Sequence, residues 1–426
     1  LRYTRRQQSS EWLIRDARLG AGRAPVAEGV DATDDEWVRP LRPARCRWRV
    51  GADVTVHLGD DGRAHWGGIE RCGSIWACPV CASVIRAQRA DDIQKAVEGW
   101  QAQGGGLVFV TLTIRHKRTD ALSVGLDAVI RGFQKLQSGA PWGRFKGRFG
   151  VRGVIRSTEV TLGENGWHPH AHALFFVDRP LSEADLTAWS SLMYGRWAGI
   201  VTRLGARLPS QLRGIDVRAA DADGKVVGQY LAKLQDEGHS SQRYGIGQEM
   251  TRFDFKSGRG HSMTPFELLD YTSRQDDNDD EAARHLWVEY VHATRGRRAV
   301  TWSRGLRELC RVETPELTDE EIIEATEAAP MVFTVPGQVY DSIKNSPDLL
   351  AYVLELVERG DMDKAIRWCG GSRPDELVDT ETGQVQPVAE IPTTTYRLKV
   401  SPPQVDESPR LTRARLALGL SPRGAA

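Results

Sequence analysis

Residues 151–177 read VRGVIRSTEVTL-GENG-WHPHAHALFFV, and the expected fold is built outward from this stretch. Two segments rich in β-branched and apolar residues flank Gly163-Glu164-Asn165-Gly166, whose composition is typical of a turn. Two strands joined by so short a link are most simply an antiparallel hairpin. The sequence therefore predicts a sheet that contains this hairpin.

The second strand of the hairpin carries histidines at alternate positions, His168, His170 and His172. Side chains of a strand alternate between two faces, so these imidazoles point to the same face. Neutral imidazoles are common ligands of divalent metals, and two of them make half of such a site. We expect His170 and His172 to be the ligands. His168 is less favoured, because it stands before Pro169 at the strand entrance.

A carboxylate on the first strand could complete this metal site. Antiparallel pairing can bring Glu159 beside His170 and His172, whereas Glu164 lies in the turn, where we expect water to solvate it. Two imidazoles and a carboxylate leave positions open for substrate oxygens, so a bound Mg²⁺ or Mn²⁺ could act as a Lewis acid. The predicted metal ligands are therefore His170, His172 and Glu159.

Four of the six cysteines lie early in the chain, at Cys46, Cys72, Cys78 and Cys81. Clustered cysteines favour a metal over a disulfide in a cytosolic protein. Zn²⁺ prefers four soft ligands in a tetrahedron, and a closed site of four cysteines is structural. We predict structural Zn²⁺ here, with His57 or His65 as alternatives to Cys46. A redox dithiol at the CxxC would leave two cysteines unexplained.

Composition and charge bound the class of protein. The chain has 426 residues, 40% of them apolar and 27% charged, which is ordinary for a globular protein of two or three domains. Its 57 basic and 57 acidic residues cancel, which excludes a uniformly basic nucleic-acid binder. No apolar run approaches the ~20 residues that cross a bilayer, and no leader is seen, so the cytoplasm is the expected location.

Basic side chains nevertheless gather between residues 131 and 156, a stretch without a carboxylate. They alternate with aromatic residues such as Trp142, Phe145 and Phe149. Cations can meet phosphates while rings stack on bases, so the pattern is typical of a nucleic-acid surface, although a solvated basic loop would look the same. The side chains predicted to contact DNA are Arg144, Lys146, Arg148 and Arg152.

The remaining patterns predict an α+β protein. A strand is expected at 107–114, helices at 82–103, 120–138, 181–197 and 225–236, and a short strand at 215–219. This order favours an antiparallel sheet with helices packed on it over a doubly wound parallel sheet. The predicted parts are an irregular arm (1–45), a Cys-rich zinc-binding module with a helix (46–100), the sheet domain (101–275), a mainly helical accessory region (276–380) and a disordered tail (381–426).

The helix expected at 225–236 carries Tyr230 and Lys233, whose i, i+3 spacing places both on one face. A tyrosine is a weak nucleophile until its proton leaves and its target is polarised. A lysine ammonium can orient a phosphate or lower the pKa of the tyrosine. A tyrosine on such a helix is usually part of the core, so this pair gains meaning only from the motifs before it.

Three motifs in this order resemble those of HUH endonucleases: residues 109–113 (FVTLT), residues 157–172 with the histidine row, and residues 230–233 (YLAK). The set is most similar to the replication initiator (Rep) proteins of rolling-circle plasmids. The cysteine module before the first strand is similar to that of actinobacterial plasmid Reps and some related transposases. The resemblance covers residues 46–300.

The resemblance implies an HUH endonuclease-like fold and an enzyme that nicks one strand of origin DNA. Tyr230 would attack the strand, leaving a 5′-phosphotyrosine and a priming 3′-OH, and Lys233 would assist. His170, His172 and Glu159 would hold Mg²⁺ or Mn²⁺ on the scissile phosphate. The implied partners are origin DNA, single-stranded or as a supercoiled duplex, and a host helicase and polymerase.

One departure from the family concerns termination. Some members carry a second tyrosine or a glutamate one turn before the nucleophile, where this chain has Val226. Termination is therefore left to water, to Tyr244 or to a second protomer.

Other functions stay open at this point. Single-strand transposases share this active site, although many have two tyrosines, whereas relaxases place the tyrosine before the histidine motif. A non-catalytic zinc-ribbon DNA-binding protein would not need Tyr230. A metal-dependent phosphoesterase without a covalent step would leave no DNA joined to the protein.

Overall fold

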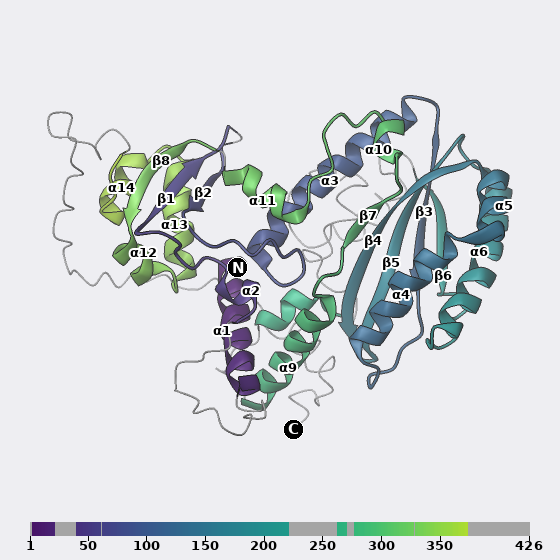
Figure 1. The fold of residues 1–426 in the computed structure, drawn as a ribbon, viewed down its shortest axis with the longest axis horizontal. Helices are drawn as coiled ribbons and strands as arrows, with labels where there is room; N and C mark the ends of the chain where they lie inside the picture. The colour runs from purple at the N-terminus through teal and green to yellow at the C-terminus, as the bar shows by residue number, and fades with distance from the viewer. Residues whose placement is uncertain are drawn as a thin grey trace, which may run out of the picture. The chain divides into compact units, whose positions relative to one another are not determined.

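The structure is a computed structural model that describes residues 2–21, 40–60, 62–220, 262–270, 277–327 and 329–373. These residues form two compact units (Figure 1). Unit 1 holds the described residues of 1–85 and 317–373, and unit 2 those of 86–316. None of the described helices is long and apolar enough to cross a membrane.

Unit 2 is built on a five-stranded antiparallel sheet in the order β6-β3-β5-β4-β7 (Figure 1). Its strands are β3 (Gly106–Thr113), β4 (Val151–Gly163), β5 (Gly166–Val177), β6 (Ile215–Ala220) and β7 (Val300–Trp302). The predicted hairpin is confirmed, because β4 and β5 pair from Gly163 opposite Gly166 onward. Gly166 has φ +82°, and a Cβ there would meet the Cα of Arg118 at 2.7 Å, so the turn requires glycine.

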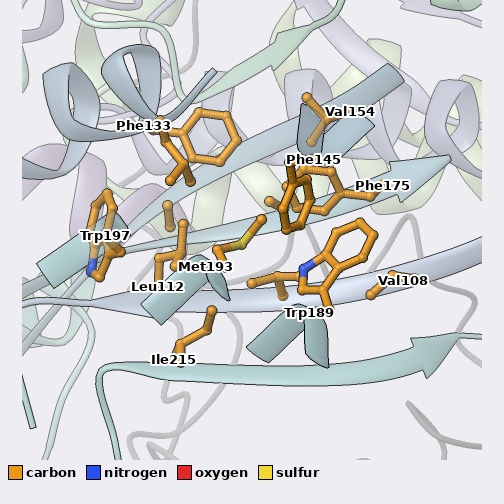
Figure 2. Close-up of a cluster of buried hydrophobic side chains, with 14 of the residues drawn as sticks. Val108, Leu112, Phe133, Phe145, Val154, Phe175, Trp189, Met193, Trp197 and Ile215 are labelled. Carbon is orange, nitrogen blue, oxygen red and sulfur yellow. The ribbon is translucent and has the colours of Figure 1, made fainter. Parts of the chain in front are cut away.

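Three helices cover one face of this sheet: α4 (Leu122–Leu136), α5 (Gly139–Phe149) and α6 (Glu183–Arg203). Figure 2 shows the core between them, where Phe145 and Phe175 lie around Trp189 with ring centroids 4.7 and 5.1 Å from it. Helix α6 begins with a capping box, in which the side chains of Ser182 and Asp185 each accept a hydrogen bond from the backbone N–H of the other. This packing confirms the α+β class with helices on an antiparallel sheet.

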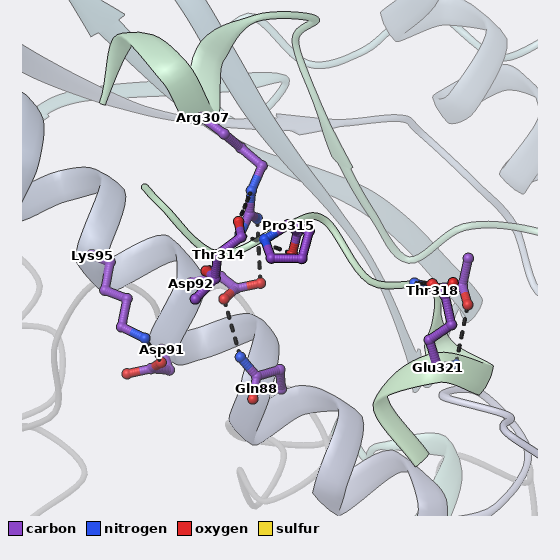
Figure 3. Close-up of polar contacts among 9 residues, drawn as sticks. All are labelled: Gln88, Asp91, Asp92, Lys95, Arg307, Thr314, Pro315, Thr318 and Glu321. Carbon is purple, nitrogen blue, oxygen red and sulfur yellow. Dashed lines mark hydrogen bonds and ion pairs between the residues drawn. The ribbon is translucent and has the colours of Figure 1, made fainter. Parts of the chain in front are cut away.

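The other face of the sheet is covered at one end by α3 (Pro79–Gln101), whose residues from Arg86 onward belong to unit 2. Ile93, Val97 and Trp100 of this helix pack on apolar side chains of the strands. Nearby, Asp92 and Arg307 form a buried ion pair at 3.3 Å, and Arg307 also donates to the carbonyl of Thr314 (Figure 3). The further elements of unit 2 are η1 (Pro265–Asp270), α9 (Asp277–Thr294) and α10 (Leu306–Leu309).

Unit 1 joins residues from both ends of the described chain. Its sheet has the order β2-β1-β8, in which Val54 of β1 lies opposite Val335 of β8. The strands are β1 (Asp53–Leu58), β2 (Ala64–Gly67) and β8 (Met331–Pro336). The helices outside α3 are α1 (Arg2–Ala21), α2 (Arg42–Arg45), α11 (Asp319–Glu327), α12 (Gly337–Ile343), α13 (Pro347–Glu358) and α14 (Met362–Cys369).

Unit 1 differs from the predicted organisation in two ways. The arm expected to be irregular contains the helix α1, which buries Trp12 and Leu13. The helical region expected at 276–380 is divided, because α9 and α10 belong to unit 2 while residues from 317 onward fold with the cysteines. Pairing of β8 with β1 accounts for the second difference. The predicted tail at 381–426 lies outside the described residues.

Candidate functional site

The three residues predicted as ligands of a catalytic metal come together on the sheet face that carries α3. Pairing of β4 with β5 places Glu159 opposite His170 and Ser157 opposite His172. The Oε2 of Glu159 lies 3.0 Å from the Nε2 of His172 and 3.3 Å from the Nε2 of His170. Their ligand atoms all lie within 4.8 Å of one another. We call these three residues the His–Glu group.

Both imidazoles of the His–Glu group have a hydrogen-bond partner at Nδ1, the ring nitrogen that faces away from Glu159. The Nδ1 of His170 lies 3.2 Å from the carbonyl oxygen of His168, which can only accept, so this Nδ1 donates. The Nδ1 of His172 lies 3.1 Å from the Oγ1 of Thr111 on β3. Each Nε2 faces the carboxylate of Glu159, to which it donates a hydrogen bond in the metal-free protein. A bound metal would displace that proton and use the Nε2 lone pair, while the Nδ1 hydrogen bond keeps the ring in place.

Glu159 is ionised in this setting. Burial alone would raise the pKa of its carboxyl, but the charges and hydrogen bonds of His170 and His172 outweigh burial and hold that pKa well below its usual value. Two nitrogen ligands and one anionic oxygen suit a divalent cation. Imidazole ligands are less usual for Mg²⁺ than for transition metals, so the donor set favours Mn²⁺.

His168 continues the row of histidines without joining the group. Its Nδ1 lies 2.9 Å from the Nε2 of His116, whose Nδ1 lies 2.9 Å from the carbonyl of Asn165. His116 therefore donates to Asn165 and accepts from His168. Burial, followed by the charges of His170 and His116, lowers the pKa of His168 to about 3, so it is neutral.

Helix α9 adds residues that the sequence patterns did not single out. Glu289 accepts hydrogen bonds from the Trp167 indole and from the backbone N–H of Leu122, each at 2.8 Å. Tyr290 stacks on Trp167, and burial raises the pKa of its hydroxyl. Tyr290 therefore packs beside the start of β5. Its hydroxyl is a poor nucleophile, because burial keeps it protonated. Tyr230, Lys233, Val226 and Tyr244 lie outside the described residues.

The four cysteines form the second group. Sulfur–sulfur distances are 3.5 Å for Cys78–Cys46 and 3.7 Å for Cys46–Cys81 and Cys72–Cys81. A tetrahedral ion with bonds of about 2.3 Å to sulfur separates its ligands by about 3.8 Å, so the spacing fits a single Zn²⁺. Cys46 completes the group, while the alternatives His57 and His65 stack on each other and lie outside it.

Two buried arginines lie beside these cysteines. Arg6 of α1 donates to the carbonyl of Cys46 at 3.0 Å, and Arg6 and Arg47 are only 6% and 4% exposed. Burial and Arg47 lower the pKa of Arg6, while Cys78 and Cys46 raise it. Four thiolates around Zn²⁺ carry a net charge of −2, which two guanidinium groups would offset. The surroundings therefore suit a tetrathiolate better than four neutral thiols.

The cations predicted to contact DNA lie elsewhere in unit 2. Arg144, Lys146 and Arg148 are exposed on α5, and Arg152 follows in β4, where it pairs with Asp178 just beyond the end of β5. The rings between them, Phe145 and Phe149, are buried in the core with Trp189. The aromatic residues of this pattern therefore serve packing. The helix covers the face opposite the His–Glu group.

Comparison with known proteins identifies the family. A Rep protein of Streptomyces lividans is 33% identical to this chain over an alignment of 319 positions, which covers 61% of this chain and 68% of that protein. The chain belongs to the plasmid replication (Rep) protein family. The family described as "Replication protein" matches residues 70–184, which contain three of the four cysteines and the whole His–Glu group.

Two further relatives of this Rep-family chain were found. A neomycin resistance protein of Streptomyces cyanogenus is 30% identical over an alignment of 294 positions, which covers 54% of this chain and 66% of that protein. A Rep protein of a Bacillus species is 29% identical over an alignment of 164 positions, which covers 35% of this chain and 52% of that protein. The Streptomyces matches agree with the predicted actinobacterial type. No solved structure matches the chain significantly.

Proposed function

We propose that this Rep-family protein starts rolling-circle replication by nicking one strand of plasmid origin DNA at the His–Glu group. The observation that supports this most strongly is the convergence of two Nε2 atoms and the carboxylate of Glu159 on one sheet face. Three ligands leave coordination positions for substrate oxygens. A bound Mn²⁺ or Mg²⁺ would polarise the scissile phosphodiester.

In this proposal Tyr230 is the nucleophile. Its hydroxyl oxygen forms a bond to phosphorus while the bond from phosphorus to the 3′ oxygen breaks. The tyrosine loses one proton and the leaving 3′ oxygen gains one, so the products are a 5′-phosphotyrosine and a free 3′-OH. Lys233 orients the phosphate by its charge. The transesterification keeps a phosphodiester bond, so the strand can be rejoined later.

The free 3′-OH would prime a host polymerase, and a host helicase would open the duplex ahead of it. This work belongs in the cytoplasm, where a plasmid is copied. Termination would use water, Tyr244 or a second protomer. The cysteine group would hold Zn²⁺ and stabilise unit 1 without taking part in the reaction.

A denaturing gel tests the proposal. Labelled single-stranded DNA from the plasmid origin is incubated with the full chain and Mn²⁺. We expect a protein–DNA adduct that survives denaturation, requires metal and disappears in Tyr230→Phe. Tyr244→Phe is the matched control and should keep the adduct.

The outcomes separate the alternatives. Nicking by Tyr230→Phe would rule out this nucleophile. Cleavage without an adduct would indicate a phosphoesterase, and binding without cleavage would indicate a DNA-binding protein. A labelled strand that the chain joins to a second, target strand would favour a transposase.

A further inference from the structure

The His–Glu group lies near one end of the central sheet. His170 is close to the start of β5, whereas Asp178 follows the end of β5 and Arg152, on β4, lies beside that far end. A DNA strand held at the group therefore runs past the loops at the start of β5. The cations of α5 are at the wrong end of the strands, and on the wrong face, to contact the same nucleotides.

Two segments at the correct end are basic. One follows β3 and the other precedes β6. Their cations are all exposed, and among the described residues the only carboxylate paired with any of them is Asp120, 3.2 Å from Arg207. We call these five side chains the basic rim: Arg115, Lys117, Arg118, Arg207 and Arg213.

The rim is attached to β3, the strand that pairs with the histidine strand β5. Thr113 lies opposite His170, and it donates its N–H to Gly214 at 3.1 Å and its hydroxyl to the carbonyl of Arg213 at 2.6 Å. Gly214 therefore lies two strands across the sheet from His170, a distance of roughly 10 Å at the usual spacing between strands. Arg115 also pairs with Arg207 in an antiparallel bridge. One DNA strand can therefore touch both the His–Glu group and the rim.

The loop before β6 also exposes apolar side chains. Leu212 is 92% exposed and Leu208 is 60% exposed, and each is next to a rim arginine in sequence. The loop that carries them is held to α6, since Tyr194 donates to the carbonyl of Pro209 at 3.1 Å. A single exposed leucine is ordinary. Two of them beside exposed cations suit a partner with alternating charge and flat apolar surface.

We propose that the basic rim and Leu212 hold the single strand of DNA that passes through the His–Glu group, an inference that rests on the proposed nicking function. Arginines of the rim bind phosphates flanking the scissile one, and Leu212 contacts the face of an unstacked base. Such contacts position the strand and carry little sequence information.

Binding of fluorescein-labelled oligothymidylate to the full chain, followed by fluorescence anisotropy over a range of salt concentrations, tests the rim. All variants carry Tyr230→Phe, so that no covalent step contributes and failure of the nicking mechanism does not affect the result. We expect Arg115→Ala/Arg213→Ala to weaken binding at least tenfold at low salt. The slope of log affinity against log salt should fall by about 0.7 for each phosphate that the variant no longer neutralises. Leu212→Ser should weaken binding without changing the slope.

Arg144→Ala/Arg148→Ala on α5 is the matched control, with the same change of charge on exposed positions. It should leave affinity and slope near those of the parent. Equal losses in both double variants, or parent affinity in the rim variant, would overturn the proposal. Photocrosslinking to 4-thiothymidine in the oligonucleotide gives an independent result. Adducts should map to residues 115–118 or 207–213, and adducts confined to 139–149 would contradict the rim.

Discussion

The two ligand groups of this protein differ in how completely they are closed. All four cysteines are buried, and four sulfurs at tetrahedral spacing leave no position for a substrate. The His–Glu group supplies only three ligand atoms, and His172 is half-buried. A metal in the first group can stabilise a fold, whereas a metal in the second can also bind a substrate oxygen.

The charges around the two groups also suit a structural metal in the cysteine group and a substrate-binding metal in the His–Glu group. Buried Arg6 and Arg47 lie beside the cysteines, so their positive charges would stabilise a negatively charged zinc–thiolate complex there. In the His–Glu group the carboxylate of Glu159 supplies the negative charge, and uncharged oxygens of Thr111 and His168 hold the histidines. A cation bound there keeps part of its charge, which is what polarisation of a phosphodiester requires.

Removal of metal from the cysteine group should have the largest effect. We expect Cys78→Ser to lose its zinc and unit 1 to lose its fold, because structural zinc contributes about 10–16 kcal/mol of apparent binding free energy to folding in small domains. Native mass spectrometry reports zinc, and limited proteolysis reports which unit opens. Cys310→Ala, a change at a buried cysteine of unit 2, should keep both. A Cys78→Ser chain that retains zinc and resists protease would refute a structural role.

Loss of the carboxylate from the His–Glu group should affect binding instead of folding. We expect Glu159→Gln to weaken Mn²⁺ affinity on the order of 100-fold, since an anionic ligand is replaced by a neutral amide. Isothermal titration with Mn²⁺ measures the change. Glu164→Gln, in the exposed turn, is the control and should bind as the parent does. Unchanged affinity in Glu159→Gln would remove this residue from the ligand set.

The same substitution predicts a pH effect in the metal-free chain. Because the pKa of Glu159 is lower in the folded state, its ionised form stabilises the fold above the ordinary carboxyl pKa of about 4.3. That stabilisation is lost as pH falls toward the folded-state pKa. Denaturant midpoints between pH 6 and pH 3 should therefore fall more steeply for the parent than for Glu159→Gln. Parallel profiles would show that Glu159 is not ionised in this way.

The hairpin explains why the His–Glu group could be predicted from the sequence. The two-residue period of a strand and a short turn fix which residues face each other, so counting along residues 159–172 brings Glu159 beside His170. Thr111 could not be assigned in this way, because its contact with His172 depends on pairing between β3 and β5, which are separated in the chain by two helices and β4. The pattern of β3 indicates which face Thr111 occupies, but it does not indicate which residue lies opposite.

Unit 1 shows what local patterns cannot reveal. Helix α1 buries Arg6, Ser9 and Ser10 together with Trp12 and Leu13, so its buried face has no apolar period to detect. Pairing of β1 with β8 joins residues from opposite ends of the described chain, and nothing in either strand names its partner. The cysteine spacing was sufficient to predict a metal group, but it gave no sign of the arginines that surround it.

The charge of Arg6 should matter to zinc binding. Arg6→Met should weaken zinc affinity by between about 10-fold and 100-fold, as loss of an outer partner of a metal group usually does. Competition with a chromophoric zinc chelator measures the affinity. Arg6→Lys keeps the charge with a similar length and should recover most of the loss. Equal affinities for the methionine and lysine variants would mean that the charge of Arg6 does not act on the cysteines.

Substitution of Thr111 should have the smallest effect, because this residue contacts the His–Glu group without being one of its ligands. Thr111→Val removes the hydroxyl that meets the Nδ1 of His172 while keeping the β-branched shape that suits β3. His172 can then turn or change tautomer, so Mn²⁺ affinity should fall about tenfold with little change in melting temperature. Thr111→Ser restores the hydroxyl and should restore affinity. If the valine and serine variants bind Mn²⁺ equally, strand geometry alone holds His172. The ligands of the His–Glu group would then be as rigidly placed as those of the cysteine group.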